Sequence, residues 1–150
     1  MMTRKKAFTT ALLLGMFGFG YALYPEDHEP NSDELALKAT AEAFVKVVDE
    51  NDAEALKGLL HPDMIQYAQL GEQLIPFKAS DFIQMVADKK LGGIPRKVTH
   101  LSARVVRGST ALVVTNAVSS EYDFMYQLSM AKTADGWVIV GILSDIKKIG

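Results

Sequence analysis

Apolar side chains in the first part of the chain recur every three to four residues. Over residues 33–50 they form a continuous stripe that would line one side of a helix. Its members are Leu37, Ala41, Phe44, Val45, Val47 and Val48. Asn31 and Glu34 stand three residues apart at its start, which is the spacing of an N-cap residue and its partner. The pattern predicts an amphipathic helix.

Two shorter helices are predicted next. One begins after Asn51, which stands three residues before Glu54 as an N-cap residue does. The other begins at Ser80 and ends before the glycine pair at 92–93. The inward positions of the two are Leu56, Leu59 and Leu60, and Phe82, Ile83 and Val86.

The apolar period shortens to two residues in the strand-like segments. MIQYAQLGEQLIPF, residues 64–77, predicts two short strands around Gly71. After residue 95, four β-rich runs follow, with turn signals at Gly108-Ser109 and Asp135-Gly136. Helices followed by consecutive strands predict an α+β fold, with three N-terminal helices packed on a curved antiparallel sheet.

Composition narrows the class of protein. The 150 residues are 49% hydrophobic and 23% charged, as in a globular domain with its own core. The formal net charge of −2 offers no basic excess for nucleic acid. The absence of cysteine excludes disulfides, thiolate metal ligands and a cysteine nucleophile. The spacing of the remaining donor residues predicts no metal site and no cofactor.

The N-terminus has the pattern of a secretion signal. Three basic residues at 4–6 precede an apolar run over residues 7–22, and Gly20 and Ala22 would be the small residues of a cleavage site. We expect export to the periplasm or beyond, and a mature net charge of about −5. The alternative is an uncleaved membrane anchor. The predicted organisation is a signal peptide over 1–22, a linker over 23–31 and one domain over 32–150.

A histidine, an aspartate and a tyrosine cluster in LKGLLHPDMIQY, residues 56–67. Pro62 disfavours helical backbone at His61, the residue before it. Asp63 is a residue type that bonds to nearby amides in turns. We interpret the cluster as the end of the second helix rather than as an active site.

The order of elements resembles the nuclear transport factor 2-like superfamily, in particular its SnoaL-like and lumazine-binding branches. The resemblance rests on AEAFVKVVDENDAEALKGLLHPDM and ADGWVIVGILSDI, and it extends over residues 32–146. It implies a cone-shaped α+β barrel with a pocket between the helices and the concave face of the sheet. It also implies a homodimer formed through the outer face of the sheet.

The ketosteroid isomerases of this superfamily imply three catalytic positions. The resemblance aligns their tyrosine with Phe44, their carboxylate base with Ala68 and their late-strand acid with Leu128. A phenyl ring donates no hydrogen bond, and a methyl group takes no proton. Steroid isomerase chemistry of the known kind is therefore not expected.

The alternation of side chains along strands predicts the pocket wall. We expect one face of the last strand to carry Trp137, Ile139, Gly141, Leu143 and Asp145 inward. The predicted lining is Phe44, Val48, Gln66, Ala68, Tyr122, Phe124, Tyr126, Leu128, Trp137 and Leu143. An apolar wall with a few polar groups is typical of a small-molecule site, although the same residues would also fill a plain core.

Three side chains are weak candidates for catalysis. Asp145 would need a partner or a raised pKa if it were buried. Tyr126 would offer a hydroxyl within the pocket. His100 is the histidine that falls within a strand pattern, and a general acid/base role would need it to face the pocket.

These patterns lead to a main hypothesis of an exported domain for binding or assembly, non-catalytic, with a small hydrophobic or heteroaromatic ligand. The alternative is a SnoaL-like dehydratase or isomerase with an atypical acid/base pair. A third hypothesis is an interaction module that uses the outer face of the sheet, where Ala103 and Thr115 are expected. Contact with a membrane is expected through the N-terminal segment alone, if it is not cleaved.

Overall fold

The computed structural model describes residues 31–150. The expected signal peptide, residues 1–22, and all but the last residue of the expected linker, residues 23–31, lie outside the described residues. Among residues 31–150, none of the helices combines the length and the hydrophobicity that crossing a bilayer requires.

Helices come first and strands dominate the rest of the chain, as the periodicity predicts. The helices are α1 (Ser32–Asp49), α2 (Ala53–Leu59) and α3 (Ala79–Ala87). The strands are β1 (Leu60–Leu70), β2 (Gln73–Lys78), β3 (Lys97–Arg107), β4 (Thr110–Val118), β5 (Tyr122–Thr133) and β6 (Gly136–Lys148).

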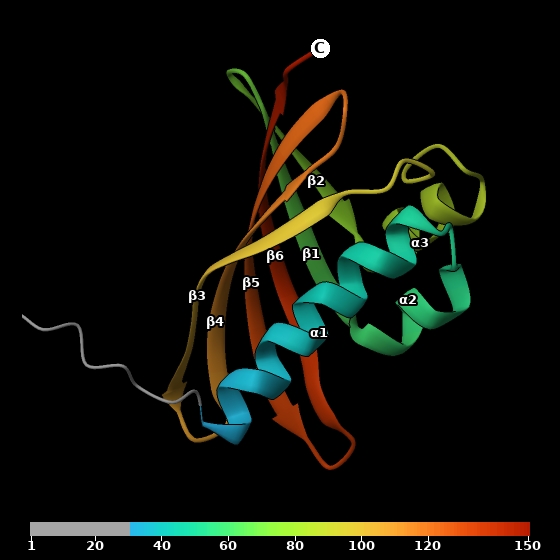
Figure 1. The fold of residues 1–150 in the computed structure, drawn as a ribbon. Coiled ribbons are helices and arrows are strands. Elements are labelled where there is room, and N and C mark those ends of the chain that lie inside the picture. Colours follow the sequence, from blue (N-terminus) through green and yellow to red (C-terminus); the bar gives the residue numbers. More distant parts are fainter. Residues whose placement is uncertain (1–30) are drawn as a thin grey trace, which may run out of the picture.

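The strands form one curved, unclosed sheet in the order β2-β1-β6-β5-β4-β3. In Figure 1, α1 crosses the concave side of the sheet, and α2 and α3 lie together near the C-terminal end of α1. The predicted α+β class with three helices on a curved sheet is confirmed. One pair, β1 with β6, is parallel rather than antiparallel. These two strands are not joined by a hairpin, because β2, α3 and β3 to β5 lie between them in the chain.

The predicted start of α1 is confirmed, and its apolar stripe forms the centre of the core. Asn31 Oδ1 accepts a hydrogen bond from the Glu34 amide at 2.8 Å, which satisfies one of the free N–H groups of the first turn. Leu37, Ala41 and Phe44 are fully buried against the sheet. The ring of Phe44 meets the ring of Phe82 from α3 at 6.1 Å.

The starts of the two shorter helices differ from the prediction. Asp52, not Asn51, caps α2, and its side chain accepts from the Ala55 amide at 3.0 Å. Asn51 adopts a left-handed backbone with φ 56°, a conformation that asparagine tolerates. Helix α3 follows Lys78 directly and has no side-chain cap among the described residues. Ser80 therefore lies inside the first turn.

The His61 cluster marks the end of α2, as interpreted from Pro62. The helix ends at Leu59, and β1 begins at the next residue. His61 and Asp63 are exposed. The Asp63 amide donates to His61 Nδ1 at 3.1 Å, so the local bond uses the backbone of Asp63 rather than its carboxylate.

A β-bulge in β6 reverses the predicted orientation of its second half. Ser129 pairs with Gly141 and Met130 with Ile139, so Val140 is left without a partner on β5. One extra residue shifts every later side chain to the opposite face. Leu143, 40% exposed, and Asp145 therefore point to the outer face, and the prediction that they line the pocket is wrong.

The predicted outer-face positions on β3 and β4 are also wrong. Thr115 is fully buried, between Val113 and Ala117 on the inner face of β4. Ala103 on β3 packs against the hydrophobic core. Inward residues alternate along β4 as expected of a strand, but the sequence pattern had left the choice of face undetermined.

Candidate functional site

A pocket of about 420 Å³ lies between the C-terminal end of α1 and the concave face of the sheet. Ligand pockets usually have volumes of this order. Strands β1 and β5, helix α3 and the loop at 88–96 complete its wall. The lining side chains are Val48, Asp49, Gln66, Ala68, Leu70, Phe77, Phe82, Lys90, Leu91, Gly92, Ile94, Arg96, Ser119, Tyr122, Phe124, Tyr126 and Ile146.

Strand β5 supplies the aromatic side of the pocket. Tyr122, Phe124 and Tyr126 occupy alternate positions and therefore face the same way. The rings of Phe124 and Tyr126 are nearly parallel, at 10°, with their centroids 5.8 Å apart. Phe44 supports Tyr126 from behind in an edge-to-face contact at 5.4 Å. The result is a largely aromatic wall on one side of the pocket, of a kind that suits contact with an apolar ring.

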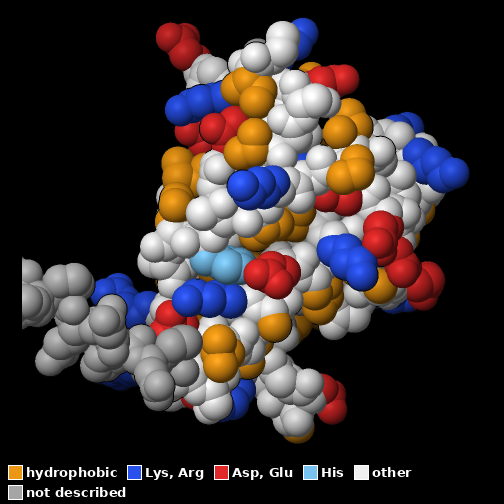
Figure 2. Space-filling view, in the orientation of Figure 1, with side chains coloured by type: hydrophobic (Ala, Val, Ile, Leu, Met, Phe, Trp, Pro, Cys, Tyr) orange, Lys and Arg blue, Asp and Glu red, His pale blue; other side chains and the backbone are white. Residues whose placement is uncertain are grey.

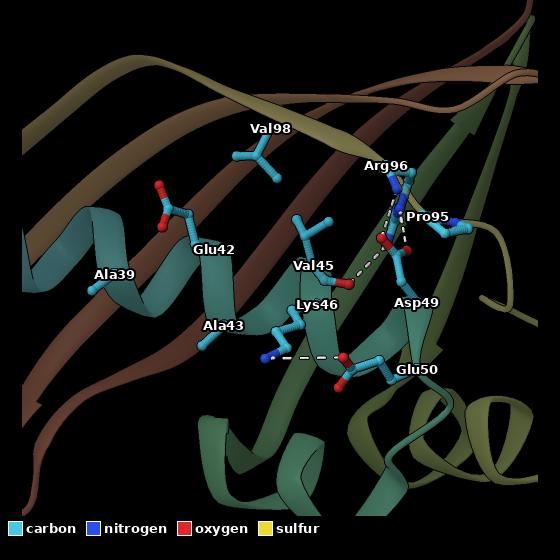
Figure 3. A pocket seen from close by; sticks show the side chains of 10 residues that line it. All are labelled: Ala39, Glu42, Ala43, Val45, Lys46, Asp49, Glu50, Pro95, Arg96 and Val98. Atoms are coloured by element: carbon cyan, nitrogen blue, oxygen red, sulfur yellow. Dashed lines mark hydrogen bonds and ion pairs between the residues drawn. The ribbon is translucent and has the colours of Figure 1, made fainter.

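A buried ion pair joins α1 to the start of β3 at the edge of this pocket. Arg96 Nε lies 2.6 Å from Asp49 Oδ1, and the two side chains are 4% and 10% exposed. The Arg96 amide also donates to Asp49 Oδ2 at 2.9 Å. Figure 3 shows the carboxylate and the guanidinium directed at each other across the gap between α1 and the strand. Both carboxylate oxygens are therefore occupied.

The same guanidinium forms part of the aromatic wall. Arg96 Nη1 donates to the Tyr126 hydroxyl, and the guanidinium carbon lies 4.8 Å from the centroid of Phe124. Burial raises the pKa of Tyr126 above its ordinary value, although the nearby charge and hydrogen bond of Arg96 act in the opposite direction. Tyr126 is thus a neutral phenol at physiological pH.

Gln66 is the other polar group of the inner wall. It is 5% exposed, and its Nε2 donates to Ser144 Oγ at 3.1 Å. Within residues 31–150, Gln66 Oε1 is one of two buried side-chain polar atoms without a hydrogen-bond partner. Leaving a buried acceptor unpaired costs about 1–3 kcal/mol, so this oxygen is a feature that folding alone does not explain.

The loop at 88–96 forms the roof of the pocket and is tied to the end of α1. Asn51 Nδ2 donates to the carbonyl oxygens of Leu91 and Val86, and the Gly93 amide donates to the Asp49 carbonyl at 2.9 Å. Gly92 has φ 84°, and a Cβ placed there would lie 1.8 Å from the Val48 carbonyl oxygen. Glycine is therefore required where the loop passes over the helix.

A second, more open groove of about 560 Å³ lies on the other side of the same ion pair, between α1 and β3. Glu42, Lys46 and Glu50 contribute charged side chains to it (Figure 3). Figure 2 shows acidic, basic and apolar side chains mixed over this side of the molecule. This groove is more open than the apolar pocket, and its wall carries several charges. We therefore place the candidate site in the apolar pocket.

The structure brings six of the ten predicted lining residues to the pocket, and they are Val48, Gln66, Ala68, Tyr122, Phe124 and Tyr126. Phe44 and Leu128 lie in the core, fully buried behind the wall. Trp137 is at the opposite end of the sheet, where its ring lies 5.5 Å from Lys132 Nζ. Leu143 is on the outer face.

Of the three catalytic candidates, Tyr126 alone reaches the pocket. Asp145 faces outward and lies 3.7 Å from Lys147 Nζ. His100 lies between β3 and α1, where its Nε2 is 2.8 Å from Glu42 Oε1 and its Nδ1 is 2.8 Å from Thr115 Oγ1. Neither side chain can act on a molecule bound in the pocket.

Asp49 and Arg96 are site residues that the sequence analysis missed. Asp49 did carry a signal, because a carboxylate in the last turn of a helix opposes the helix dipole and so invites a tertiary explanation. Arg96 carried none, since an arginine after Pro95 is unremarkable. Their contact spans 47 positions of sequence, which periodicity cannot detect.

Comparison with solved structures shows the fold. A nuclear transport factor 2-like protein of unknown function from Silicibacter pomeroyi DSS-3 superposes with a TM-score of 0.67 and 20% identity, over 75% of this chain and 94% of that one. A ketosteroid isomerase-like protein from Erwinia carotovora atroseptica SCRI1043 gives 0.64 and 14%, over 80% and 98%. A nuclear transport factor 2-like protein of unknown function in nutrient uptake from Rhodospirillum rubrum ATCC 11170 gives 0.65 and 15%, over 74% and 98%.

Comparison at the level of sequence families is more specific. No curated protein matches the chain. Residues 32–142 match the family described as "Putative lumazine-binding", and this segment contains α1, the roof loop and the aromatic strand of the pocket. The chain therefore belongs to that family, and its fold is the one seen in nuclear transport factor 2-like proteins.

Proposed function

We propose that this protein is an exported, dimeric domain that binds a small hydrophobic or heteroaromatic molecule without transforming it. The observation that carries the proposal is the pocket of about 420 Å³, whose wall combines aromatic and aliphatic side chains with an ion pair that is already matched. The family description, which names lumazine binding, supports a ring compound as the ligand class. Aromatic side chains suit such a ligand because flat faces stack on one another.

The protonation states of the pocket favour binding over catalysis. Arginine stays protonated in proteins, and Arg96 already occupies both oxygens of Asp49. The raised pKa of Tyr126 keeps its phenol neutral. Ala68, at the position that the resemblance gives to a catalytic base, cannot take a proton. Neither Tyr126, whose phenol stays neutral, nor Ala68 offers a general base near neutral pH.

A dehydratase or isomerase is the second candidate function. It is favoured by the Tyr126 hydroxyl, which receives a hydrogen bond from Arg96 and could polarise a bound carbonyl group. A test is the ultraviolet absorbance of a β,γ-unsaturated ketone incubated with the protein. Conjugation that is lost in Tyr126→Phe and kept in Asp145→Asn would establish catalysis in this pocket.

The binding proposal is tested with the neutral fluorophore N-phenyl-1-naphthylamine, which brightens in apolar surroundings. We expect saturable binding by the full-length protein. Ala68→Phe should abolish it, because Ala68 is 3% exposed and lines the pocket, so the ring would fill the space. Ala39→Phe adds the same ring at an exposed position of α1 and should bind like the unmodified protein. Equal binding by both variants would place the ligand elsewhere.

Export is tested by the intact mass of the protein purified from its own host. A basic start, an apolar run and small residues at 20 and 22 support cleavage after Ala22. We expect the mass of residues 23–150 and recovery from the soluble envelope fraction. The mass of the full chain in the membrane fraction would instead support the anchor alternative.

The outer face of the sheet supports the dimer. Tyr67 on β1 pairs with Leu143 on β6, and both are about 40% exposed, as is Ile65 nearby. Neighbouring exposed apolar side chains on one sheet face are typical of an interface between subunits. The helix-bearing side, by contrast, carries mixed charges (Figure 2).

A further inference from the structure

The unpaired carbonyl oxygen of Gln66 is the feature of the pocket that protein contacts leave unexplained. Gln66 is 95% buried and lines the pocket from β1. Its Oε1 has no partner within residues 31–150. Buried acceptors in folded proteins nearly always have a donor, and a bound ligand is one source of that donor.

The contacts of Ser144 determine which end of the Gln66 amide is unpaired. Ser144 Oγ lies 3.5 Å from the Tyr67 carbonyl oxygen, to which it donates its one hydrogen. It must therefore act as an acceptor toward Gln66, which places Nε2 at 3.1 Å from Ser144. The oxygen is left as the free end of the amide.

Tyr126 provides a second polar contact on the same wall. Tyr126 opposes Ser144 across β5 and β6, and Ser144 opposes Ala68 across β6 and β1. Gln66 and Tyr126 thus lie on the two strands that flank Ser144. The Tyr126 oxygen accepts from Arg96, and its hydrogen has no acceptor among the described residues. Gln66 Oε1 and the Tyr126 hydroxyl hydrogen are thus an acceptor and a donor of this wall that no described residue pairs.

The charges at the pocket are already balanced. Arg96 is matched by Asp49 at 2.6 Å. Lys90, at the rim, is 69% exposed and lies 3.4 Å from Asp88, so water solvates it. A charged ligand would lose its hydration without meeting an unpaired charge. The inner wall therefore favours an uncharged molecule.

From these contacts we infer that the pocket selects an uncharged planar ring compound with an O–H or N–H donor on its edge, and that Gln66 is the specificity-determining residue that accepts this hydrogen. The inference rests on the proposed binding function. It adds the polarity of the ligand edge and the side chain that recognises it. In this arrangement the aromatic side chains of β5 contact the ring of the ligand, and Gln66 accepts a hydrogen bond from its edge.

Two probes that differ in one hydrogen-bond donor test the inference. 2-Naphthol is uncharged at pH 7 and donates through its hydroxyl; 2-methoxynaphthalene has the same ring and oxygen but no donor. We expect the full-length protein to bind 2-naphthol about five- to tenfold more tightly, the effect of one hydrogen bond, as measured by naphthalene fluorescence. The anion 2-naphthoate should bind more weakly than 2-naphthol.

2-Methoxynaphthalene also carries a methyl group that 2-naphthol lacks, and a pair of variants separates the effect of this group from that of the hydrogen bond. Gln66→Met keeps the length of the side chain and removes the acceptor, so the preference for 2-naphthol should fall about five- to tenfold. Gln127→Met makes the same change at an exposed position of β5 and should keep the preference. The emission of Trp137, at the far end of the sheet, reports whether each variant is folded.

Each outcome separates this inference from the proposed function. Equal affinity of the unmodified protein for 2-naphthol and 2-methoxynaphthalene would overturn the role of Gln66 while leaving an apolar binding pocket. Preference for 2-naphthoate would overturn the uncharged ligand class. Binding of none of the probes, nor of N-phenyl-1-naphthylamine, would remove the binding function itself. The comparison of probes on the unmodified protein needs no variant to fold.

Discussion

Asp49 and Arg96 determine the electrostatics of the site at the scale of single residues. A buried guanidinium is tolerated because the carboxylate neutralises it and Tyr126 and Val45 each accept one further hydrogen bond from it. The pair also joins α1 to β3, elements distant in sequence. It therefore serves stability and pocket shape together.

Removing Asp49 should leave the Arg96 charge uncompensated. We expect Asp49→Ala to lower the free energy of unfolding by about 3–5 kcal/mol, as for other broken buried pairs, measured by urea denaturation followed at Trp137. Glu50→Ala removes the partner of the exposed Lys46 and should change stability by less than about 1 kcal/mol. Similar losses in the two variants would contradict a special role for the buried pair.

Tyr126 should make stability fall at high pH. Its pKa is raised in the folded protein and ordinary, near 10.0, in the unfolded chain. Its stabilising contribution is therefore complete below pH 10 and is lost as the pH rises through the folded-state pKa. Spectrophotometric titration should show one late-ionising tyrosine, absent in Tyr126→Phe. A titration unchanged by that substitution would disprove the assignment.

At the scale of elements, the turn between α3 and β3 shapes the roof of the pocket. Its path over the end of α1 depends on Gly92, whose positive φ and contact with Val48 leave no room for a side chain. Asn51 holds the same loop from below. Asn51, which was expected to cap α2, thus holds the roof loop in place instead.

Gly92→Ala should displace this loop. We expect a loss of about 1–3 kcal/mol from the backbone conformation alone, with further loss from the overlap with Val48. Affinity for N-phenyl-1-naphthylamine should fall as well, because Leu91 and Ile94 line the pocket. Gly108→Ala, at a turn where a Cβ meets nothing within 4 Å, is the matched control. Normal binding by Gly92→Ala would show that the roof is dispensable.

At the scale of the whole molecule, the curved sheet separates two surfaces for which we propose different uses. The concave face holds the core and, at one end, the pocket. The convex face exposes Ile65, Tyr67 and Leu143 side by side. The proposed ligand site and the proposed dimer interface therefore lie on opposite sides of the same strands and share no residues.

The convex face predicts the result of a charge substitution. Leu143→Glu should convert the proposed dimer to a monomer, observed by sedimentation velocity, because an interface core tolerates charge poorly. Leu101→Glu introduces the same side chain at a bulge of the edge strand β3, where Leu101 is 58% exposed, and should remain dimeric. A dimer that survives Leu143→Glu would move the interface to another surface.

The sequence by itself determined the features that depend on local period. The apolar stripe from Leu37 to Val48, the hairpin around Gly71 and the shared face of Tyr122, Phe124 and Tyr126 all follow from spacing. This information was enough for the fold class and for much of the aromatic wall. The family resemblance supplied the location of a pocket between helices and sheet.

The tertiary structure alone decided which residues meet. Asp49 and Arg96 pair across 47 positions, and Gln66 and Ser144 across 78. The bulge at Val140 turned Leu143 and Asp145 outward, because one unpaired residue reverses all side chains after it. Periodicity specifies the faces of an element, whereas contacts between distant elements depend on how the whole chain closes around its core.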